Sequence, residues 1–194
     1  MPYQYQPLSI ADDPDDVYIR LFELHQGPRT GPITGRLYST LLSKAPSFFA
    51  LSYCWGSTSR NGTVHITNSA PPRDLDNDNT LDIPPALIPL LYQTRDRRSL
   101  KARTWWIDSI CLNQNDAEEK NIHVPKMREV YMKATCTISW LGLEADGSRE
   151  AIAYADKLSK TYRRHMAERK LVTLTPDEEK EDVQMIKSNL VILD

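Results

Sequence analysis

Four short runs of β-forming residues, separated by segments with helical spacing, constrain most strongly how this 194-residue chain folds. From about residue 48, the predicted order is strand, strand, helix, strand, helix, strand, helix, helix. Strands that alternate with helices favour a mainly parallel sheet with helices packed on its faces. The chain is therefore predicted to belong to the α/β class.

Two further strands precede this alternation, and a turn region rich in glycine and proline, "QGPRTGPITG" at 26–35, separates them. The apolar run "SFFALSYCWG" at 47–56 suits a strand that is buried on both faces. A polar loop is expected at 68–84. The predicted strands are 17–24, 36–42, 47–56, 63–67, 104–112 and 135–142, and the predicted helices are 84–98, 116–134, 148–170 and 175–193.

The helix at 116–134 carries its own start signal and an interruption. Asp116 is placed as the N-cap, and Glu119 stands three residues later, as in a capping box. Pro125 lacks the N–H that a helix interior needs. We therefore expect a short first turn and a helix that restarts near residue 125.

Charge and cysteine usage restrict the classes of partner and compartment. Lys and Arg number 24 against 26 Asp and Glu, so no broad basic face for nucleic acid is expected. No apolar run reaches the roughly 18 residues of a membrane helix, and the start lacks a secretory pattern. The odd set of cysteines has no CxxC spacing, which indicates reduced thiols and a cytoplasmic protein. The isolated histidines His65 and His123 do not predict a metal site.

The chain is predicted to contain one folded domain. Residues 1–16 are polar and contain proline, so we interpret them as a lead-in. Residues 17–194 would form the domain, with a motif core at 48–142 and C-terminal helices at 148–193.

Three blocks of the motif core resemble a known family. "FFALSYCWG" (48–56), "WIDSICLNQNDAEEK" (106–120) and "KMREVYMKATCTISWLG" (126–142) are similar in order and spacing to the three sequence blocks of the HET (heterokaryon incompatibility) domain of filamentous fungi. The chain departs from the family pattern at His123 and Pro125. The resemblance implies a fungal programmed-cell-death effector with a TIR-like (flavodoxin-like) core and extra N-terminal strands.

The likeness to TIR domains implies a chemistry. Some TIR domains cleave NAD at the nicotinamide–ribose bond with a glutamate on a helix after a central strand. Glu119 matches that location, so we expect it to be the catalytic acid, with NAD as a substrate and no cofactor. The alternative is that Glu119 is the reciprocal arm of the capping box. Its neighbour Glu118, on a different helical face, is the weaker candidate.

Asp108 is the second candidate catalytic residue, in support of Glu119. If the predicted strand 104–112 continues, Asp108 shares a face with Trp106 and Ile110. A carboxylate among such groups must be hydrogen-bonded, or its pKa rises. It is either a structural anchor for backbone or tryptophan N–H groups, or a polar group beside the ligand crevice at the carboxyl ends of the strands.

Five residues at the ends of the two core strands are candidate substrate-binding positions: Tyr53, Trp55, Gly56, Asn113 and Gln114. The alternatives are a core lid for Trp55 and turn chemistry for Asn113, whereas turn chemistry explains Gln114 poorly. No glycine-rich phosphate loop is present, which argues against a conventional dinucleotide site.

These observations lead to a hypothesis with two alternatives. The first is an effector that hydrolyses NAD when it self-associates, so its partners would be further copies of itself and an upstream fungal sensor. The alternatives are a non-enzymatic module that kills by assembly or recruitment, and a degenerate domain without activity.

Overall fold

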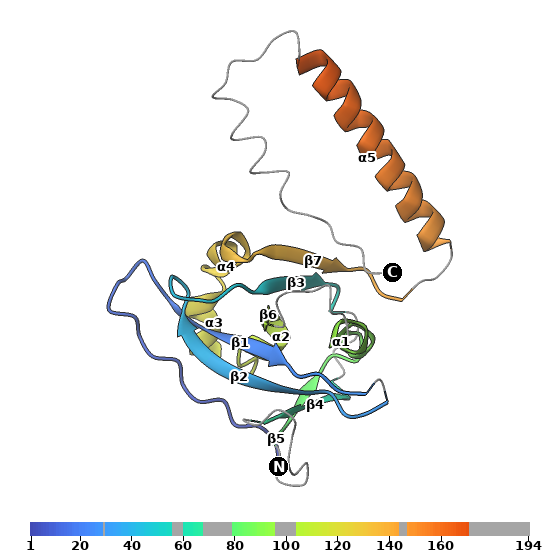
Figure 1. The fold of residues 1–194 in the computed structure, drawn as a ribbon. Helices are drawn as coiled ribbons and strands as arrows, with labels where there is room; N and C mark the ends of the chain where they lie inside the picture. Colours follow the sequence, from blue (N-terminus) through green and yellow to red (C-terminus); the bar gives the residue numbers. More distant parts are fainter. Residues whose placement is uncertain (29, 56–59, 68–78, 96–103, 144–146, 171–194) are drawn as a thin grey trace. The chain divides into compact units, whose positions relative to one another are not determined.

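The computed structural model describes residues 1–28, 30–55, 60–67, 79–95, 104–143 and 147–170. The described residues form two compact units that divide between Leu141 and Gly142, and each unit is described by itself. A sheet with seven described strands organises the first unit (Figure 1). The strands are β1 (Tyr18–Leu24), β2 (Thr34–Leu41), β3 (Phe49–Tyr53), β4 (Gly62–Ile66), β5 (Asn79–Ile83), β6 (Thr104–Trp106) and β7 (Cys136–Trp140).

The sheet is mixed, so the expectation of a mainly parallel sheet is not confirmed. The strand order is β5-β4-β2-β1-β6-β3-β7. β3 pairs in parallel with β6 and β7, and β2 with β4, whereas β1–β2, β1–β6 and β4–β5 are antiparallel. The turn region at 26–33 folds β2 back on β1, which imposes an antiparallel hairpin on the N-terminal strands. The parallel group β6-β3-β7 is the part of the sheet that follows the predicted alternation.

The apolar runs supply the core as predicted. Phe22 of β1 lies opposite Trp105 of β6, and both side chains are buried. Ala50 and Leu51 of β3 are also buried, as expected for a strand covered on both faces. This core fixes the positions of the strand ends that carry the candidate site.

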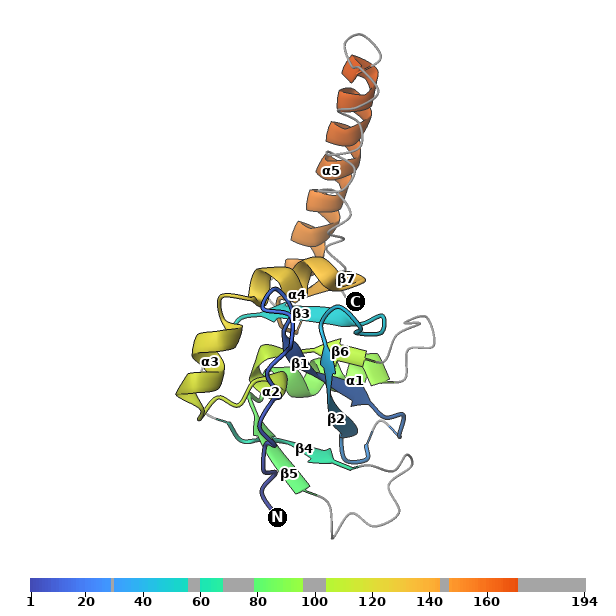
Figure 2. The same cartoon turned by 90° about the vertical axis from the view of Figure 1, so that its left-hand side faces the viewer.

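The described helices of the first unit are α1 (Leu87–Arg95), α2 (Asp108–Cys111), α3 (Ala117–His123) and α4 (Met127–Lys133). The predicted interruption at Pro125 is confirmed, because α3 ends at His123 and α4 begins at Met127. Figure 2 shows α3 and α4 as separate helices.

Two local predictions are wrong. The predicted strand 104–112 ends at Trp106, and the chain turns into the single helical turn α2. The N–H of Cys111 bonds to the carbonyl of Ile107 at 2.7 Å, a local bond that an extended strand cannot make. The alternation argument for Asp108 therefore fails. The last part of the segment predicted as a polar loop at 68–84 forms strand β5 instead, and its Leu81 and Ile83 are buried.

The N-terminal segment is packed on the domain. Pro2 forms a β-bridge with Thr80 of β5, and the Tyr3 N–H donates to the Thr80 carbonyl at 2.8 Å. The Tyr5 hydroxyl donates to the carbonyl of Ile110 in α2 at 2.8 Å. In Figure 2 the segment, in dark blue, passes beside α3 before it enters β1.

The described part of the second unit contains α5 (Ser148–Lys170), which matches the predicted helix 148–170. Leu158 and Tyr162, from its predicted apolar stripe, are exposed by 52% and 65%. The helix predicted at 175–193 lies outside the described residues. Across the described residues, no helix combines the length and apolar character needed to span a membrane.

Candidate functional site

Polar and aromatic side chains meet where the parallel strands β3 and β6 end. The Trp55 indole N–H, two residues after β3, donates to Asp108 Oδ2 at 3.0 Å. The Tyr53 hydroxyl, at the end of β3, donates to Ser109 Oγ at 2.7 Å. The Tyr53 and Trp55 rings are nearly parallel, with centroids 6.4 Å apart. This carboxyl edge is where ligands bind in open α/β sheets.

The carboxylate of Asp108 is largely buried, which disfavours its negative charge. Burial raises its pKa above the ordinary aspartate value, and hydrogen bonds from Trp55 and from the Ser109 N–H, at 2.7 Å, oppose that rise only in part. The anchor alternative is therefore realised, because the carboxylate accepts one tryptophan and one backbone N–H. The ligand alternative is compatible with it, because Trp55 is 46% exposed.

Arg60 and Gln114 complete the surroundings of Asp108. Arg60 Nη2 donates to the Ser109 carbonyl at 2.6 Å, and its positive charge lowers the Asp108 pKa. Gln114 Nε2 donates to the Asp108 carbonyl at 2.9 Å, so this amide holds the turn after α2. Gly56 lies outside the described residues.

Asn113 performs turn chemistry. Its Oδ1 accepts the Asn115 N–H at 3.2 Å, and its own N–H donates to Glu119 Oε1 at 2.8 Å. Tyr53, Trp55, Asp108 and Gln114 therefore lie together, whereas Asn113 belongs with Glu119.

Glu119 is tied to the protein by both carboxylate oxygens. Arg20 of β1 donates from Nη1 to Oε1 at 2.6 Å and from Nη2 to Oε2 at 2.9 Å. The side chains of Arg20 and Glu119 are only 4% and 7% exposed. Half of the predicted capping box forms, because Asp116 Oδ1 accepts the Glu119 N–H at 3.0 Å. The Glu119 carboxylate, however, accepts the N–H of Asn113.

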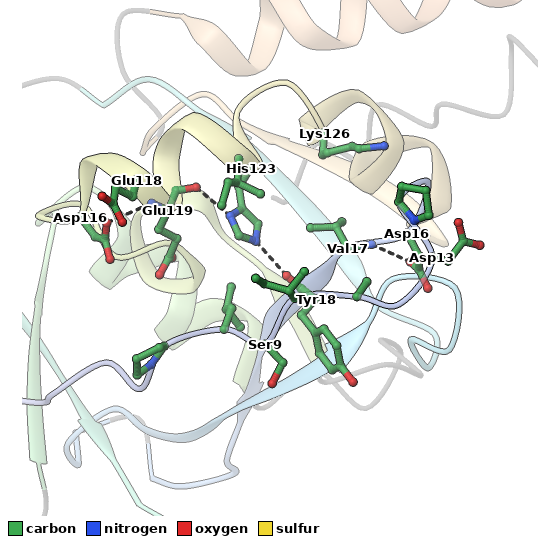
Figure 3. Close-up of a pocket in the computed structure, with 16 residues that line it drawn as sticks. Ser9, Asp13, Asp16, Val17, Tyr18, Asp116, Glu118, Glu119, His123 and Lys126 are labelled. Atoms are coloured by element: carbon green, nitrogen blue, oxygen red, sulfur yellow. Dashed lines mark hydrogen bonds between the residues drawn. The ribbon is translucent and has the colours of Figure 1, made fainter.

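A cavity of about 360 Å³ borders Glu119 on the side of the N-terminal segment (Figure 3). Residues of this segment, such as Ser9, form one wall, and α3 forms another. His123 also lines it, and its Nδ1 and Nε2 lie 2.7 Å from the Glu119 carbonyl and 2.8 Å from the Tyr18 carbonyl. His123 thus joins α3 to β1, a structural role for this departure from the family pattern.

The sequence matches the family described as heterokaryon incompatibility protein (HET) over residues 48–191. The chain belongs to this family. It is also similar to "Heterokaryon incompatibility protein 6, OR allele" of Neurospora crassa, with 32% identity over 158 residues. This alignment covers 77% of the present chain and 22% of the relative, so the chain spans about a fifth of that protein. No solved structure matches the chain.

Four residues of this HET chain near the candidate site were missed by sequence reasoning: Arg20, Arg60, Ser109 and Tyr131. Tyr131 of α4 donates to the Leu51 carbonyl at 3.0 Å, and burial, with a smaller effect of Asp108, raises its pKa to about 12. For Arg20 a signal was present. It is a charged residue inside the β-forming run "VYIRLFEL", and a charge in a buried strand requires a partner.

Proposed function

We propose that this HET domain acts in fungal incompatibility, as the name of its Neurospora relative suggests, and that it is a cell-death effector. We further propose that it hydrolyses NAD at the nicotinamide–ribose bond when it self-associates. The observation that carries this proposal is Asp108, a carboxylate of raised pKa beside the partly exposed Trp55 at the carboxyl edge of parallel strands.

The reaction makes modest demands on a protein. As the bond to the cationic nicotinamide breaks, the ribose becomes oxocarbenium-like, and a nearby carboxylate stabilises it. Nicotinamide leaves as a neutral molecule, so no general acid is required. Water adds to the ribose carbon and releases a proton, which gives ADP-ribose. The Trp55 ring provides a surface on which a nicotinamide or adenine ring stacks.

The contacts of the two acids alter their proposed roles. The sequence predicts Glu119 as the essential acid and Asp108 in support. Both Glu119 oxygens are bound to Arg20, and releasing them would leave a buried cation without its partner. Asp108 has no such ion pair among the described residues, so we assign it the position beside the ribose. Glu119 then holds α3 and the following loop in place.

The same proposal includes self-association of the chain and TIR-like catalysis at the carboxyl ends of the parallel strands. The parallel strands β3, β6 and β7 provide the edge, and a second copy would complete the site beside it. An upstream fungal sensor would bring copies together.

A second candidate function is a non-enzymatic module that signals by assembly or recruitment. The Glu119–Arg20 pair favours it, because the carboxylate at the TIR-like location is engaged in the fold. Under this reading Asp108 serves only as the anchor of Trp55 and Ser109.

The decisive experiment incubates the purified chain with NAD over a range of protein concentrations and measures nicotinamide release. Oligomeric state is measured by light scattering in the same samples. The variants are Asp108→Asn and Glu119→Gln, with Glu118→Gln as the matched control on α3. We expect release by the wild type and Glu118→Gln, and loss in folded Asp108→Asn.

The same variants are expressed in a fungal host to score cell death. If self-associated protein releases no nicotinamide, and Asp108→Asn kills as well as the wild type does, the enzymatic proposal fails and the assembly function stands. If the wild type neither cleaves NAD nor kills, both functions fail.

A further inference from the structure

Arg95, the last residue of α1, is a buried cation in an unusual setting. Arg95 is only 2% exposed. The guanidinium carbon lies 5.0 Å from the centroid of the Tyr92 ring. A β-carbon added at Gly27 would lie 3.5 Å from the same atom, so the turn region after β1 also closes on the guanidinium.

One end of this guanidinium is satisfied. Nη1 donates to the Pro32 carbonyl at 2.9 Å and to the Gly31 carbonyl at 3.4 Å. The Tyr92 hydroxyl donates to that Gly31 carbonyl at 3.1 Å. The ring contact and these bonds fix both the plane and the rotation of the group.

The other edge is unfilled. Nε and Nη2 of Arg95 are buried and have no hydrogen-bond partner among the residues that the structure describes. In an arginine these two nitrogens lie side by side and point their N–H groups the same way. They form a fork that matches the two oxygens of a carboxylate or a phosphate.

Two other arginines show what such forks hold in this protein. Arg36 donates from Nε and Nη2 to Glu23 Oε2 at 3.1 and 2.8 Å, through the same edge that is open in Arg95. Arg20 uses its Nη1 and Nη2 atoms to hold Glu119. Arg95 is the most buried of the three and has no carboxylate partner among the described residues.

A buried charge with unpaired donors is costly, and the negative end of the α1 dipole offsets that cost only in part. We propose that the Nε/Nη2 fork of Arg95 is a binding site for an oxyanion, the phosphate or carboxylate group of a ligand. Gly27, Gly31 and Pro32, which lie against the guanidinium, would flank that ligand. This site shares no residue with the candidate site around Asp108, and it does not rest on the proposed NAD hydrolysis.

The test observes the Arg95 Nε–H by NMR while the full chain is titrated with inorganic phosphate, with acetate, and with chloride at matched ionic strength. We expect a saturable shift of this resonance with phosphate or acetate, and none with chloride. Stronger binding of phosphate identifies a phosphate ligand, and stronger binding of acetate identifies a carboxylate ligand.

Two variants sharpen the result. Arg95→Lys keeps the charge and removes the fork. The Kd for the anion should therefore rise by about tenfold or more, which is the scale of one charge-assisted hydrogen bond. Arg36→Lys alters an exposed arginine whose fork is already filled, and it should bind as the wild type does. The wild-type titration decides the matter even if Arg95→Lys fails to fold. The absence of a saturable shift, or an equal shift with chloride, overturns the proposal.

Discussion

Replacing Glu119 by glutamine tests whether its carboxylate is part of the fold. The substitution preserves shape but leaves the guanidinium of Arg20, 4% exposed, without its negative partner. Of the two Arg20 bonds of 2.6 and 2.9 Å, one is lost because the amide NH2 cannot accept a hydrogen bond, and the other loses the charge of its acceptor. Breaking a buried pair from one side costs about 3–5 kcal/mol, a large share of the roughly 5–15 kcal/mol that stabilises a domain. We therefore expect a marginally stable variant.

The assay is urea unfolding followed by tryptophan fluorescence, because Trp105 and Trp106 lie in the core. Glu118→Gln, one residue away on the surface of α3, is the matched control and should stay within about 0.5 kcal/mol of the wild type. The double variant Arg20→Met/Glu119→Leu removes both charges. It should lose much less than the sum of its two single variants, because neither partner is left as a buried lone charge.

The reasoning is refuted if Glu119→Gln unfolds at the same urea concentration as Glu118→Gln, or if the double variant loses the full sum. Either result would mean that the ion pair contributes little. The Glu119 carboxylate would then be free to turn toward the neighbouring cavity, and its assignment as the catalytic acid would regain its basis.

Three further predictions follow from other parts of the first unit. Gly35→Ala should lower the free energy of unfolding by about 1–3 kcal/mol in a urea titration, because its β-carbon would overlap the Phe22 ring. Burial raises the Asp108 pKa, so its contribution to stability should be full below the unfolded value of about 3.9 and fall as the pH rises through the folded value. Asp108→Asn should abolish that fall in urea titrations across this range. Burial raises the Cys111 pKa to about 12, so a thiol reagent should modify exposed Cys54 in the native protein and Cys111 only after unfolding.

Features with local causes were predictable from the sequence. Asp116 caps α3 because a short side-chain oxygen at that position reaches the N–H three residues on. Pro125 separates two helices because it has no backbone N–H to donate to a helical carbonyl. The strands at 18–24, 49–53 and 136–140 follow from continuous β-forming runs.

Features with long-range causes were not predictable. The mixed sheet depends on β1 entering between β2 and β6, and no local pattern states which neighbour a strand takes. The end of β6 at Trp106 has the same origin. β1 pairs with β6 at only two positions, Phe22–Trp105 and Glu23–Thr104, so the later residues gain more from the bonds of α2 than from extension.

Asp108 and Glu119, the two acids compared above, both lie in the family block at 106–120 and show how local and long-range causes combine. Asp108 and Glu119 lie eleven positions apart in one block, and the sequence offers the same chemistry at both. Arg20, which lies outside that block, separates them: it neutralises Glu119 and leaves Asp108 bound only by neutral donors. Burial raises the pKa of Asp108, and the bonds from Trp55 and Ser109 and the charge of Arg60 oppose that rise only in part. Under the proposed function, this block therefore divides into an acid that holds the scaffold and an acid that acts on the ribose, and a strand almost ninety residues earlier makes the division.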